Sequence, residues 1–256
     1  MFHMMNEARI MVGTGAALTA LCGYEYSLDY AKERPQGRLP SCKDPESPPV
    51  NIIEHADVRR MLLAQKAYAE GSFALCLLGT QLADDCKTAE TEEERQHAHT
   101  LLDFLTPIIK TWPSEYGPKA NYLAIQVMGG AGYVNEHQVE MFYRDNRLNP
   151  IHEGTTGIQS LDLLARKVPM NNLAGYHAII AAMEASIVEA RQQDELSVYA
   201  DALAAAIVTL QQTTESLLGA MMGKNIDLAL SNSVKYLELF GHVVMAWVWL
   251  KQGIVA

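Results

Sequence analysis

The sequence predicts an all-α protein, and three observations lead to that prediction. Apolar residues recur at spacings of three, four and seven over long stretches of the chain, which is the pattern of amphipathic helices. No segment shows the sustained apolar–polar alternation of a half-buried β-strand. Hydrophobic residues make up 49% of the chain and include 12 methionines, which fits a packed, adaptable helical core. We therefore expect a helical bundle followed by additional long helices.

The N-terminal part of the chain is expected to form a helix, a loop and a second helix. Residues 4–33 have helical periodicity. Residues 35–50 contain five of the ten prolines, and this density of prolines predicts a loop. Apolar residues then return to one broad helical face over residues 51–90.

The next helices are predicted from their start and stop signals. Thr91 and Glu94 have the spacing of a capping box, in which each side chain binds the backbone N–H of the other residue. We expect two helices beyond it, over residues 97–111 and 114–128. Pro107 falls inside the first of them and predicts a kink or an interruption there.

The C-terminal half continues as helices separated by short joints. Residues Gly129 to Gly132 end the preceding helix, as glycines after a helix C-terminus do. A short helix is expected over residues 136–145, and another from about Thr155 to Lys167. After a joint that begins at Val168, three long helical patterns follow, over residues 173–192, 195–222 and 225–252.

Composition excludes several classes of function. The chain has 20 basic and 30 acidic residues and a formal net charge of −10, so it should repel nucleic acid and anionic membranes. Its four cysteines form no C-x-x-C pair, and we expect reduced thiols in a cytoplasmic protein rather than a zinc site or a disulfide scaffold. No uninterrupted apolar stretch reaches the roughly 18 residues that a membrane span needs.

Glu94-x-x-His97 is half of the signature of a carboxylate-bridged di-iron centre. Such a centre needs a second pair of the same kind and two further inward-facing glutamates. The sequence contains no second E-x-x-H pair. We therefore interpret the match as the start of a surface helix and predict no metal site.

Two short motifs each allow a structural and a functional interpretation. The run Gln126 to Tyr133, with its glycines, can end a helix, and it also lets a ligand approach the backbone closely. Glu153 precedes Gly154 just ahead of a new helix. It can serve as an electrostatic cap or as a general base held on a turn.

Four separated motifs together resemble one family. The motifs are Y-A-K-E-R at 30–34, Q-V-M-G-G-A-G-Y at 126–133, R-D at 144–145 and I-H-E-G-T-T-G-I-Q at 151–159. In this order and spacing they resemble the C-terminal helical domain of acyl-CoA dehydrogenases. The stretch 236–250 is similar to the extra C-terminal helices of the longer bacterial members. We expect one domain over residues 1–168 and an additional helical region, truncated relative to those members, over residues 169–256.

The resemblance also implies that the chain is part of something larger. Members of the family begin with an N-terminal helical domain and a central β domain, which would precede Met1, and the longer ones continue beyond Trp249. We therefore expect a C-terminal fragment of a larger enzyme or a product truncated at both ends, whose own activity is doubtful.

The chemistry implied by the resemblance is the FAD-dependent α,β-dehydrogenation of an acyl-CoA thioester. Glu153 matches the base that removes the α-proton, while FAD accepts the β-hydrogen as hydride. Enclosure beside an apolar acyl chain strengthens a carboxylate as a base. The implied partners are an acyl-CoA substrate, electron-transfer flavoprotein or a similar electron acceptor, and further copies of the chain.

The family's other contacts transfer to residues of this sequence. Asn6, Arg9 and Gly154 match substrate contacts. The matched cofactor contacts are Arg34, Gln36, His55, Gln126, Gly129, Gly130, Thr155 and Gly157. Arg34 and the segment from Gln126 to Gly130 match residues that reach the FAD of a neighbouring subunit, which implies a homodimer or homotetramer. Gly157 stands where other members carry a glutamine.

Alternative functions follow from the same residues. A non-catalytic helical module that mediates oligomerisation would leave its bundle face as an exposed apolar patch. The DNA-associated branch of the superfamily is disfavoured by the charge of −10. An oxidase relative stays open, because the shape of the pocket decides whether oxygen reaches the flavin.

Overall fold

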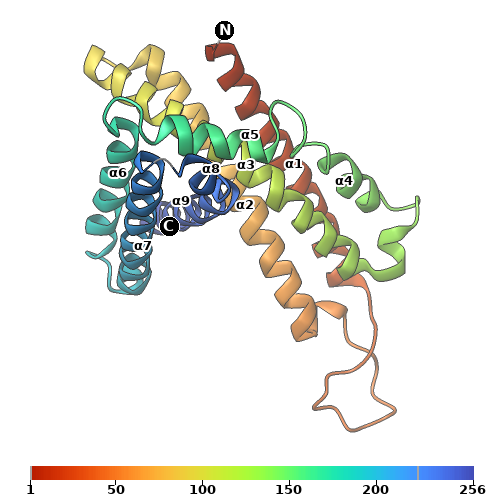
Figure 1. The fold of residues 1–256 in the computed structure, drawn as a ribbon. Helices are drawn as coiled ribbons and strands as arrows, with labels where there is room; N and C mark the ends of the chain where they lie inside the picture. The colour runs from red at the N-terminus through yellow and green to blue at the C-terminus, as the bar shows by residue number, and fades with distance from the viewer. Residues whose placement is uncertain (1, 224) are drawn as a thin grey trace. The chain divides into compact units, whose positions relative to one another are not determined.

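The computed structural model describes residues 2–223 and 225–256, with side chains from residue 6 onward, and it is helical (Figure 1). The helices are α1 (Phe2–Glu33), α2 (Ala56–Thr88), α3 (Glu92–Met128), α4 (Val139–Asn146), α5 (Thr156–Leu161), α6 (Ala174–Ala190), α7 (Ser197–Met222), α8 (Ile226–Leu230) and α9 (Ser233–Val255). Short 3-10 turns cover Ile52–Glu54, Gly129–Tyr133 and Asp194–Leu196, and a π-helical stretch covers Asp162–Lys167. Within the described ranges, the β-type pairing is one isolated bridge between Pro35 and Asn51. The predicted all-α class is confirmed.

The chain divides into two compact units that interleave in sequence. Unit 1 comprises Met1–Met11, Ala74–Trp112 and Ile151–Ala256, and unit 2 comprises Val12–Phe73 and Pro113–Pro150. The helices α1, α2 and α3 each contribute residues to both units. The expected division into residues 1–168 and 169–256 has its boundary in the sequence and does not correspond to these two units. It stays a prediction.

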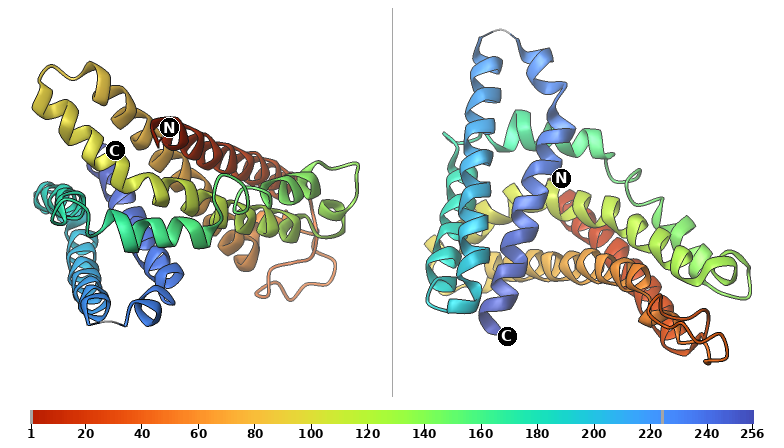
Figure 2. Two further views of the ribbon diagram at one scale, coloured as in Figure 1. Left: turned by 45° about the horizontal axis from the view of Figure 1, so that its top comes forward. Right: turned by 90° about the horizontal axis from the view of Figure 1, so that it is seen from below.

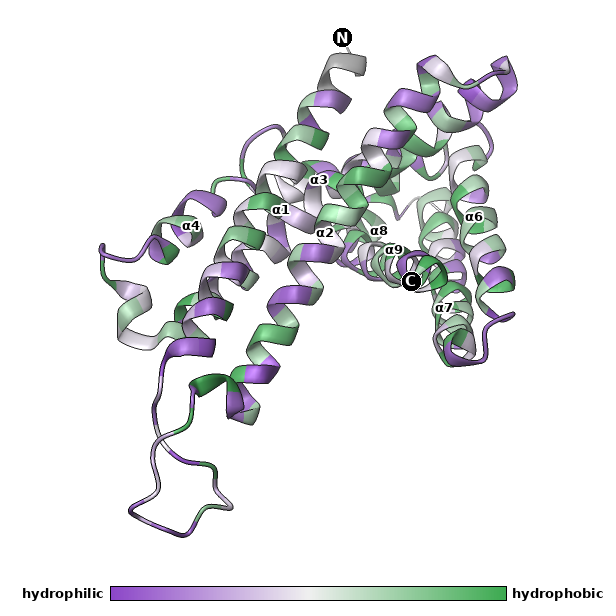
Figure 3. Ribbon diagram, turned by 180° about the vertical axis from the view of Figure 1, so that it is seen from behind, coloured by the Kyte–Doolittle hydropathy of each residue, from purple (hydrophilic) through white to green (hydrophobic). Residues whose placement is uncertain are grey.

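Unit 1 is a helical core in which α6, α7 and α9 pack against one another and α5 packs on α9 (Figure 2). Phe240 of α9 lies at its centre, with ring-centroid distances of 5.4 Å to Phe104, 6.3 Å to Tyr176 and 5.9 Å to Tyr236. The buried Tyr236 hydroxyl shares a 2.8 Å hydrogen bond with the Thr214 hydroxyl. Hydrophobic and hydrophilic residues recur along α6 and α7 (Figure 3), as expected of helices with one buried face.

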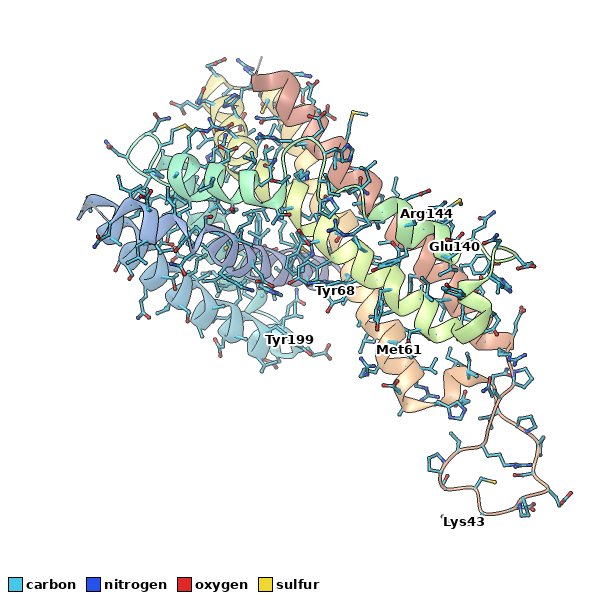
Figure 4. The ribbon with its side chains drawn as sticks, turned by 45° about the vertical axis from the view of Figure 1, so that its right-hand side comes forward. Lys43, Met61, Tyr68, Glu140, Arg144 and Tyr199 are labelled. Carbon is cyan, nitrogen blue, oxygen red and sulfur yellow. The ribbon has the colours of Figure 1, made fainter. Side chains whose placement is uncertain are left out.

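Unit 2 packs parts of α1, α2 and α3 around a small apolar cluster. The cluster consists of Ala31, Ile52, Met61, Leu62 and Val127. Asn146 of α4 is fully buried and donates to the Asn121 side chain at 2.7 Å and to the Ala16 carbonyl at 3.1 Å. These bonds fasten α4 to α3 and α1. Figure 4 shows Met61 and Tyr68 along α2, Glu140 and Arg144 on α4, and Lys43 in the extended loop between α1 and α2.

The prediction of two helices between residues 97 and 128 is wrong. Helix α3 runs without a break from Glu92 to Met128, through Pro107 and Pro113. A proline inside a helix costs about 3 kcal/mol. Burial of one large aliphatic side chain stabilises by about 2 kcal/mol, and Leu105, Ile108 and Ile109 are all fully buried beside Pro107. Packing therefore outweighs the lost backbone hydrogen bond.

Several of the start and stop signals are confirmed. The Thr91 hydroxyl accepts from the Glu94 N–H at 3.2 Å, and the Glu94 carboxylate accepts from the Thr91 N–H at 3.0 Å. The bond from the Thr91 N–H to the carboxylate, together with a side-chain hydrogen bond from Thr91, holds the pKa of Glu94 below its usual range. Gly129 follows α3 with φ +60°. The last expected helix, over residues 225–252, is divided at Ser231–Asn232 into α8 and α9.

Candidate functional site

Glu153 lies on an exposed turn between Pro150 and α5 in unit 1. Its φ is +53° and that of Gly154 is +92°, so two successive residues adopt the left-handed region that non-glycine residues rarely enter. The Glu153 carboxylate is exposed and makes no hydrogen bond or ion pair with any residue that the structure describes. The turn thus presents a solvated carboxylate that its own protein leaves unpaired.

Two buried side chains hold the backbone of this turn from inside unit 1. The Lys110 ammonium of α3 donates to the Gly154 carbonyl at 2.8 Å. The Gln159 amide of α5 donates to the Glu153 carbonyl at 3.1 Å and to the Gly154 carbonyl at 3.4 Å. Both side chains belong to fully buried residues. Sequence reasoning missed both, although a lysine among the aliphatic residues of α3 was an available signal.

The helix after the turn begins as the sequence predicted. The Thr155 hydroxyl accepts from the Ile158 N–H at 3.4 Å and caps α5. Gly157 has room around it, since a Cβ added there would meet only the Thr155 hydroxyl, at 3.9 Å. The Ser160 hydroxyl joins the Gly157 carbonyl to Ser233 of α9. Thr155 and Gly157 therefore follow Glu153 in a segment that is capped at Thr155 and bonded to α9 through Ser160.

The two other candidate substrate residues are tied to partly buried acids of unit 1. Arg9 is buried and pairs with Asp162 at 3.0 Å. The Asn6 amide donates to the Asp103 carboxylate at 3.3 Å. Asn6 and Asp103 also line a cavity of about 300 Å³.

Asp103 forms an ion pair with the buried Lys167. Burial alone would raise the pKa of Asp103, but the hydrogen bond and the charge of Lys167, together with the Asn6 amide, outweigh burial and lower it. An acid held ionised in this way can keep the Asn6 amide oriented.

Five of the eight candidate cofactor residues line one cavity of about 380 Å³ in unit 2. They are Arg34, Gln36, His55, Gln126 and Gly129. The apolar side chains Ile52, Val58 and Val127 also line the cavity. Three separate segments of the chain, around residues 34, 55 and 126, are therefore brought together by the fold.

Backbone and ring contacts build the frame of this cavity. Pairing of the Gln36 N–H with the Val50 carbonyl at 2.9 Å closes the base of the proline-rich loop. The His55 ring donates from Nε2 to the Gln36 carbonyl at 2.8 Å, since a carbonyl can only accept. His55 thus has a structural bond beside its expected cofactor contact. The Arg34 side chain is exposed and has no ion-pair partner in the part of the chain that the structure describes.

The polar groups that line this cavity are of the kind that can bind the adenosine and pyrophosphate part of a dinucleotide. A free guanidinium suits a pyrophosphate, and the Gln126 amide can bind a ribose or a base edge. A Cβ added at Gly129 or Gly130 would meet nothing within 4 Å, so the space beside that backbone is open to a ligand. The roles of these residues stay predictions.

The described residues contain no group of three or more His, Cys, Asp or Glu side chains arranged to hold a metal ion. In the same residues, no helix is both long enough and apolar enough to cross a membrane.

Comparison with known proteins identifies the family. Residues 1–168 match the family model "Acyl-CoA dehydrogenase, C-terminal domain". Residues 177–256 match a second model, "Acetyl-CoA dehydrogenase C-terminal like". The first match alone covers more than half of the chain.

Curated relatives and solved structures agree with these matches. The broad-specificity linear acyl-CoA dehydrogenase FadE5 of Mycobacterium tuberculosis is 31% identical over 100% of this chain and 43% of its own length. The 3-methylmercaptopropionyl-CoA dehydrogenase of Ruegeria pomeroyi is 35% identical over 96% of this chain and 42% of its own length. Caenorhabditis elegans ACDH-11, solved in complex with C11-CoA, superposes with a TM-score of 0.79 at 18% identity, covering 98% of this chain and 40% of that one.

The chain therefore spans about two fifths of the length of these curated relatives. Over that span the sequence matches and the helical fold give the same assignment. The chain belongs to the acyl-CoA dehydrogenase family.

Proposed function

We propose that this chain carries the base-bearing C-terminal helices of an enzyme that dehydrogenates acyl-CoA thioesters with FAD. The observation that carries the proposal is the Glu153 turn. It presents an unpaired carboxylate beside a glycine, on a backbone that is held from behind by Lys110 and Gln159. A base needs free lone pairs and a fixed position close to the proton that it removes.

In the proposed reaction, an oxygen of the Glu153 carboxylate takes the proton from the α-carbon of the thioester. FAD, when bound, supplies the acceptor for the hydride that leaves the β-carbon. The acyl-CoA thus loses one proton and one hydride and becomes a 2-enoyl-CoA. Gly154, which carries no side chain, leaves room for the thioester next to the base.

The cavity around Arg34 is proposed to hold the adenosine and pyrophosphate part of FAD. Arg34 would pair with the pyrophosphate, and Gln126 would bind the adenosine with the open backbone at Gly129 and Gly130. Thr155 and Gly157 belong to the other unit and would contact the cofactor there. By the family pattern, the cavity serves the FAD of a neighbouring subunit, so we propose a homodimer or homotetramer.

The remaining parts of the proposal follow from the family. The substrate would be an acyl-CoA, and electrons would pass from FAD to electron-transfer flavoprotein or a similar acceptor. A cytoplasmic location stays a prediction. The alternative of a non-catalytic oligomerisation module is not favoured, because the chain belongs to a family whose curated members are enzymes.

The test uses this chain fused behind the part of FadE5 that its match does not cover. Glu153→Gln keeps the size of the side chain and removes the basic oxygen. We expect turnover of linear acyl-CoA substrates, followed with an electron-accepting dye, to fall at least about a thousandfold, while the fusion keeps its flavin absorbance.

Glu93→Gln is the matched control, since Glu93 is an exposed glutamate in the first turn of α3. It should leave turnover unchanged. Full activity of Glu153→Gln would mean that the base lies elsewhere.

A further inference from the structure

We propose that Lys110 and Gln159 are positioning residues that hold the Glu153 turn in the conformation used for proton abstraction. This inference rests on the proposed function, because it matters for catalysis only where Glu153 is the base. Lys110 lies outside the four motifs that resemble the family, and Gln159 is the last residue of the 151–159 motif, for which no contact was expected.

The first step of the argument is backbone strain. Glu153 has a Cβ and still adopts φ +53°. Residues in such sparsely populated conformations persist only where the surrounding structure holds them, and they gather at functional sites. The turn therefore needs a restraint from the structure around it.

The restraint is a pair of donors beneath the turn. Lys110 and Gln159 are fully buried. Together they donate to two successive carbonyl groups of the turn, those of Glu153 and Gly154. Gln159 approaches so closely that a Cβ at position 154 would lie 2.6 Å from its Nε2 atom. A side chain at position 154 would therefore displace this donor.

The second step is that neither buried polar group is explained by packing. Burial of an ammonium group is costly, and Lys110 follows Ile108 and Ile109 in a helix segment where an aliphatic residue would pack well. The Gln159 Oε1 atom is buried without a hydrogen-bond partner among the described residues. A flipped amide would place this oxygen against the two turn carbonyls, so the donation from Nε2 fixes the orientation of the amide.

The consequence for the reaction is specific. Removal of either donor should let the turn relax, so that the carboxylate points toward the substrate for a smaller fraction of the time. Proton abstraction would slow, whereas acyl-CoA binding, which depends on other contacts, would not. The expected pattern is a lower kcat with little change in KM.

The first experiment measures the turn itself in the 256-residue chain. A glutamate-specific protease cleaves after Glu153 and, as an internal reference, after Glu46 in the exposed loop between α1 and α2. Lys110→Met and Gln159→Met keep the length of each side chain and remove the donor. Each should raise the ratio of cleavage at 153 to cleavage at 46 about tenfold, the effect of one lost hydrogen bond.

Ile109→Ala is the control for general destabilisation. Ile109 is fully buried in the same helix and packs on Gly79 of α2, so its truncation loosens unit 1 without touching the turn. It should raise the cleavage ratio far less than either donor variant, because it leaves both bonds to the turn in place. A ratio that rises equally in all three variants, or in none, would overturn the proposal.

The second experiment measures turnover in the fusion with FadE5. Lys110→Met and Gln159→Met should each lower kcat about tenfold with KM within about twofold. They should also increase the kinetic isotope effect of α-deuterated acyl-CoA, because proton abstraction becomes more rate-limiting. A merely structural role would not move that isotope effect.

The two proposals fail in distinguishable ways. If Glu153→Gln retains turnover, the proposed base is wrong. If Glu153→Gln is inactive while Lys110→Met and Gln159→Met keep both the wild-type kcat and the wild-type cleavage ratio, only the positioning role is wrong. Should one of the two variants fail to fold, the other decides.

Discussion

The Glu153 turn of unit 1 and the Arg34 cavity of unit 2 both carry candidate site residues, but they are built in opposite ways. At the turn, the acting group is exposed and the groups that hold it are fully buried: Lys110 and Gln159. At the cavity, Arg34 and Gln126 are exposed, and backbone pairing beneath them shapes the site.

Because of this difference, substitutions behind the Glu153 turn should change both stability and function, whereas substitutions at the Arg34 cavity should change function with little effect on stability. Substitutions behind the turn remove buried hydrogen bonds or charges, so they should destabilise unit 1 as well as disturb the base. Substitutions at the cavity change only solvated side chains, which usually move stability little. All three tryptophans, Trp112, Trp247 and Trp249, lie in unit 1, so tryptophan fluorescence reports the unfolding of that unit.

The largest expected effect is loss of the buried charge pair near the turn. Arg9 and Asp162 each have only 9% of the side chain exposed. Asp162→Ala leaves a buried guanidinium without this partner and should lower the free energy of unfolding by about 3 kcal/mol. Urea titration followed by tryptophan fluorescence measures the change.

Asp57→Ala is its counterpart beside the cavity. Asp57 pairs with Arg60, and their side chains are 71% and 63% exposed. Its removal should cost at most about 0.5 kcal/mol, measured by urea unfolding followed by circular dichroism, because the tryptophans lie in unit 1 and Asp57 in unit 2. Equal losses of unfolding free energy in Asp162→Ala and Asp57→Ala would contradict the contrast between the buried contacts of the turn and the solvated contacts of the cavity.

A second comparison uses the two glycines with positive φ. At Gly154, φ is +92° and an added Cβ would meet the Gln159 amide at 2.6 Å. At Gly129, φ is +60° and an added Cβ would meet nothing within 4 Å. Gly154→Ala should cost about 2–3 kcal/mol, as backbone strain and a clash combine, and Gly129→Ala about 1 kcal/mol from strain alone.

Unfolding by urea, followed by circular dichroism, gives both values. A cost at Gly129 as large as that at Gly154 would show that something fills the space beside the cavity backbone.

The pH dependence of unit 1 is a third test. Burial opposes ionisation of Asp103, but Lys167 and Asn6 hold its pKa below the ordinary value of 3.8. The folded state therefore binds this proton less readily than the unfolded state. The resulting stability is fully present above about pH 4 and is lost as the pH falls through the lowered pKa.

Asp103→Asn removes that contribution. The difference in unfolding free energy between wild type and variant should shrink as the pH falls from 5 toward the lowered pKa, when both are followed by tryptophan fluorescence. A difference that stays constant over this range would mean that Asp103 is not held ionised by its partners.

The fold was predictable where local signals agree with the tertiary structure. The helix over residues 4–33, the loop over 35–50 and the capping box of Thr91 and Glu94 all depend on short-range chemistry, and all are observed. The prediction of two separate helices over residues 97–128 failed, because α3 continues through Pro107. There the local cost of the proline was visible in the sequence, whereas the burial of Ile108 and Ile109 that outweighs it is a tertiary effect.

The candidate site residues also fall into those that local motifs mark and those that only tertiary contacts bring together. The turn at Glu153 and the glycines after α3 were recognisable from motifs. The convergence of Arg34, His55 and Gln126 on one cavity was implied by the family and could not follow from spacing. Lys110 and Gln159 were missed because their role depends on contacts across 44 and 6 residues of sequence. The lysine among the aliphatic residues of α3 is a local signal, but it does not say which group the lysine binds.

The smallest effect on stability is expected at Arg34, together with a large effect on binding. Arg34→Ala removes an exposed side chain without an ion-pair partner among the described residues, so unfolding should change by less than about 0.5 kcal/mol. If the guanidinium pairs with the cofactor pyrophosphate, the variant should bind FAD and ADP about tenfold or more weakly. FMN, which lacks the adenosine half, should show no change.

Arg38→Ala is the matched control, since Arg38 is an exposed arginine whose side chain binds the Pro45 and Ser47 carbonyls of its own loop. Calorimetry with the three ligands separates the outcomes. If Arg34→Ala weakens FMN binding as much as FAD binding, Arg34 contacts another part of the cofactor. If both arginine variants weaken FAD binding equally, Arg34 has no specific contact and is one of several solvated charges near the cavity.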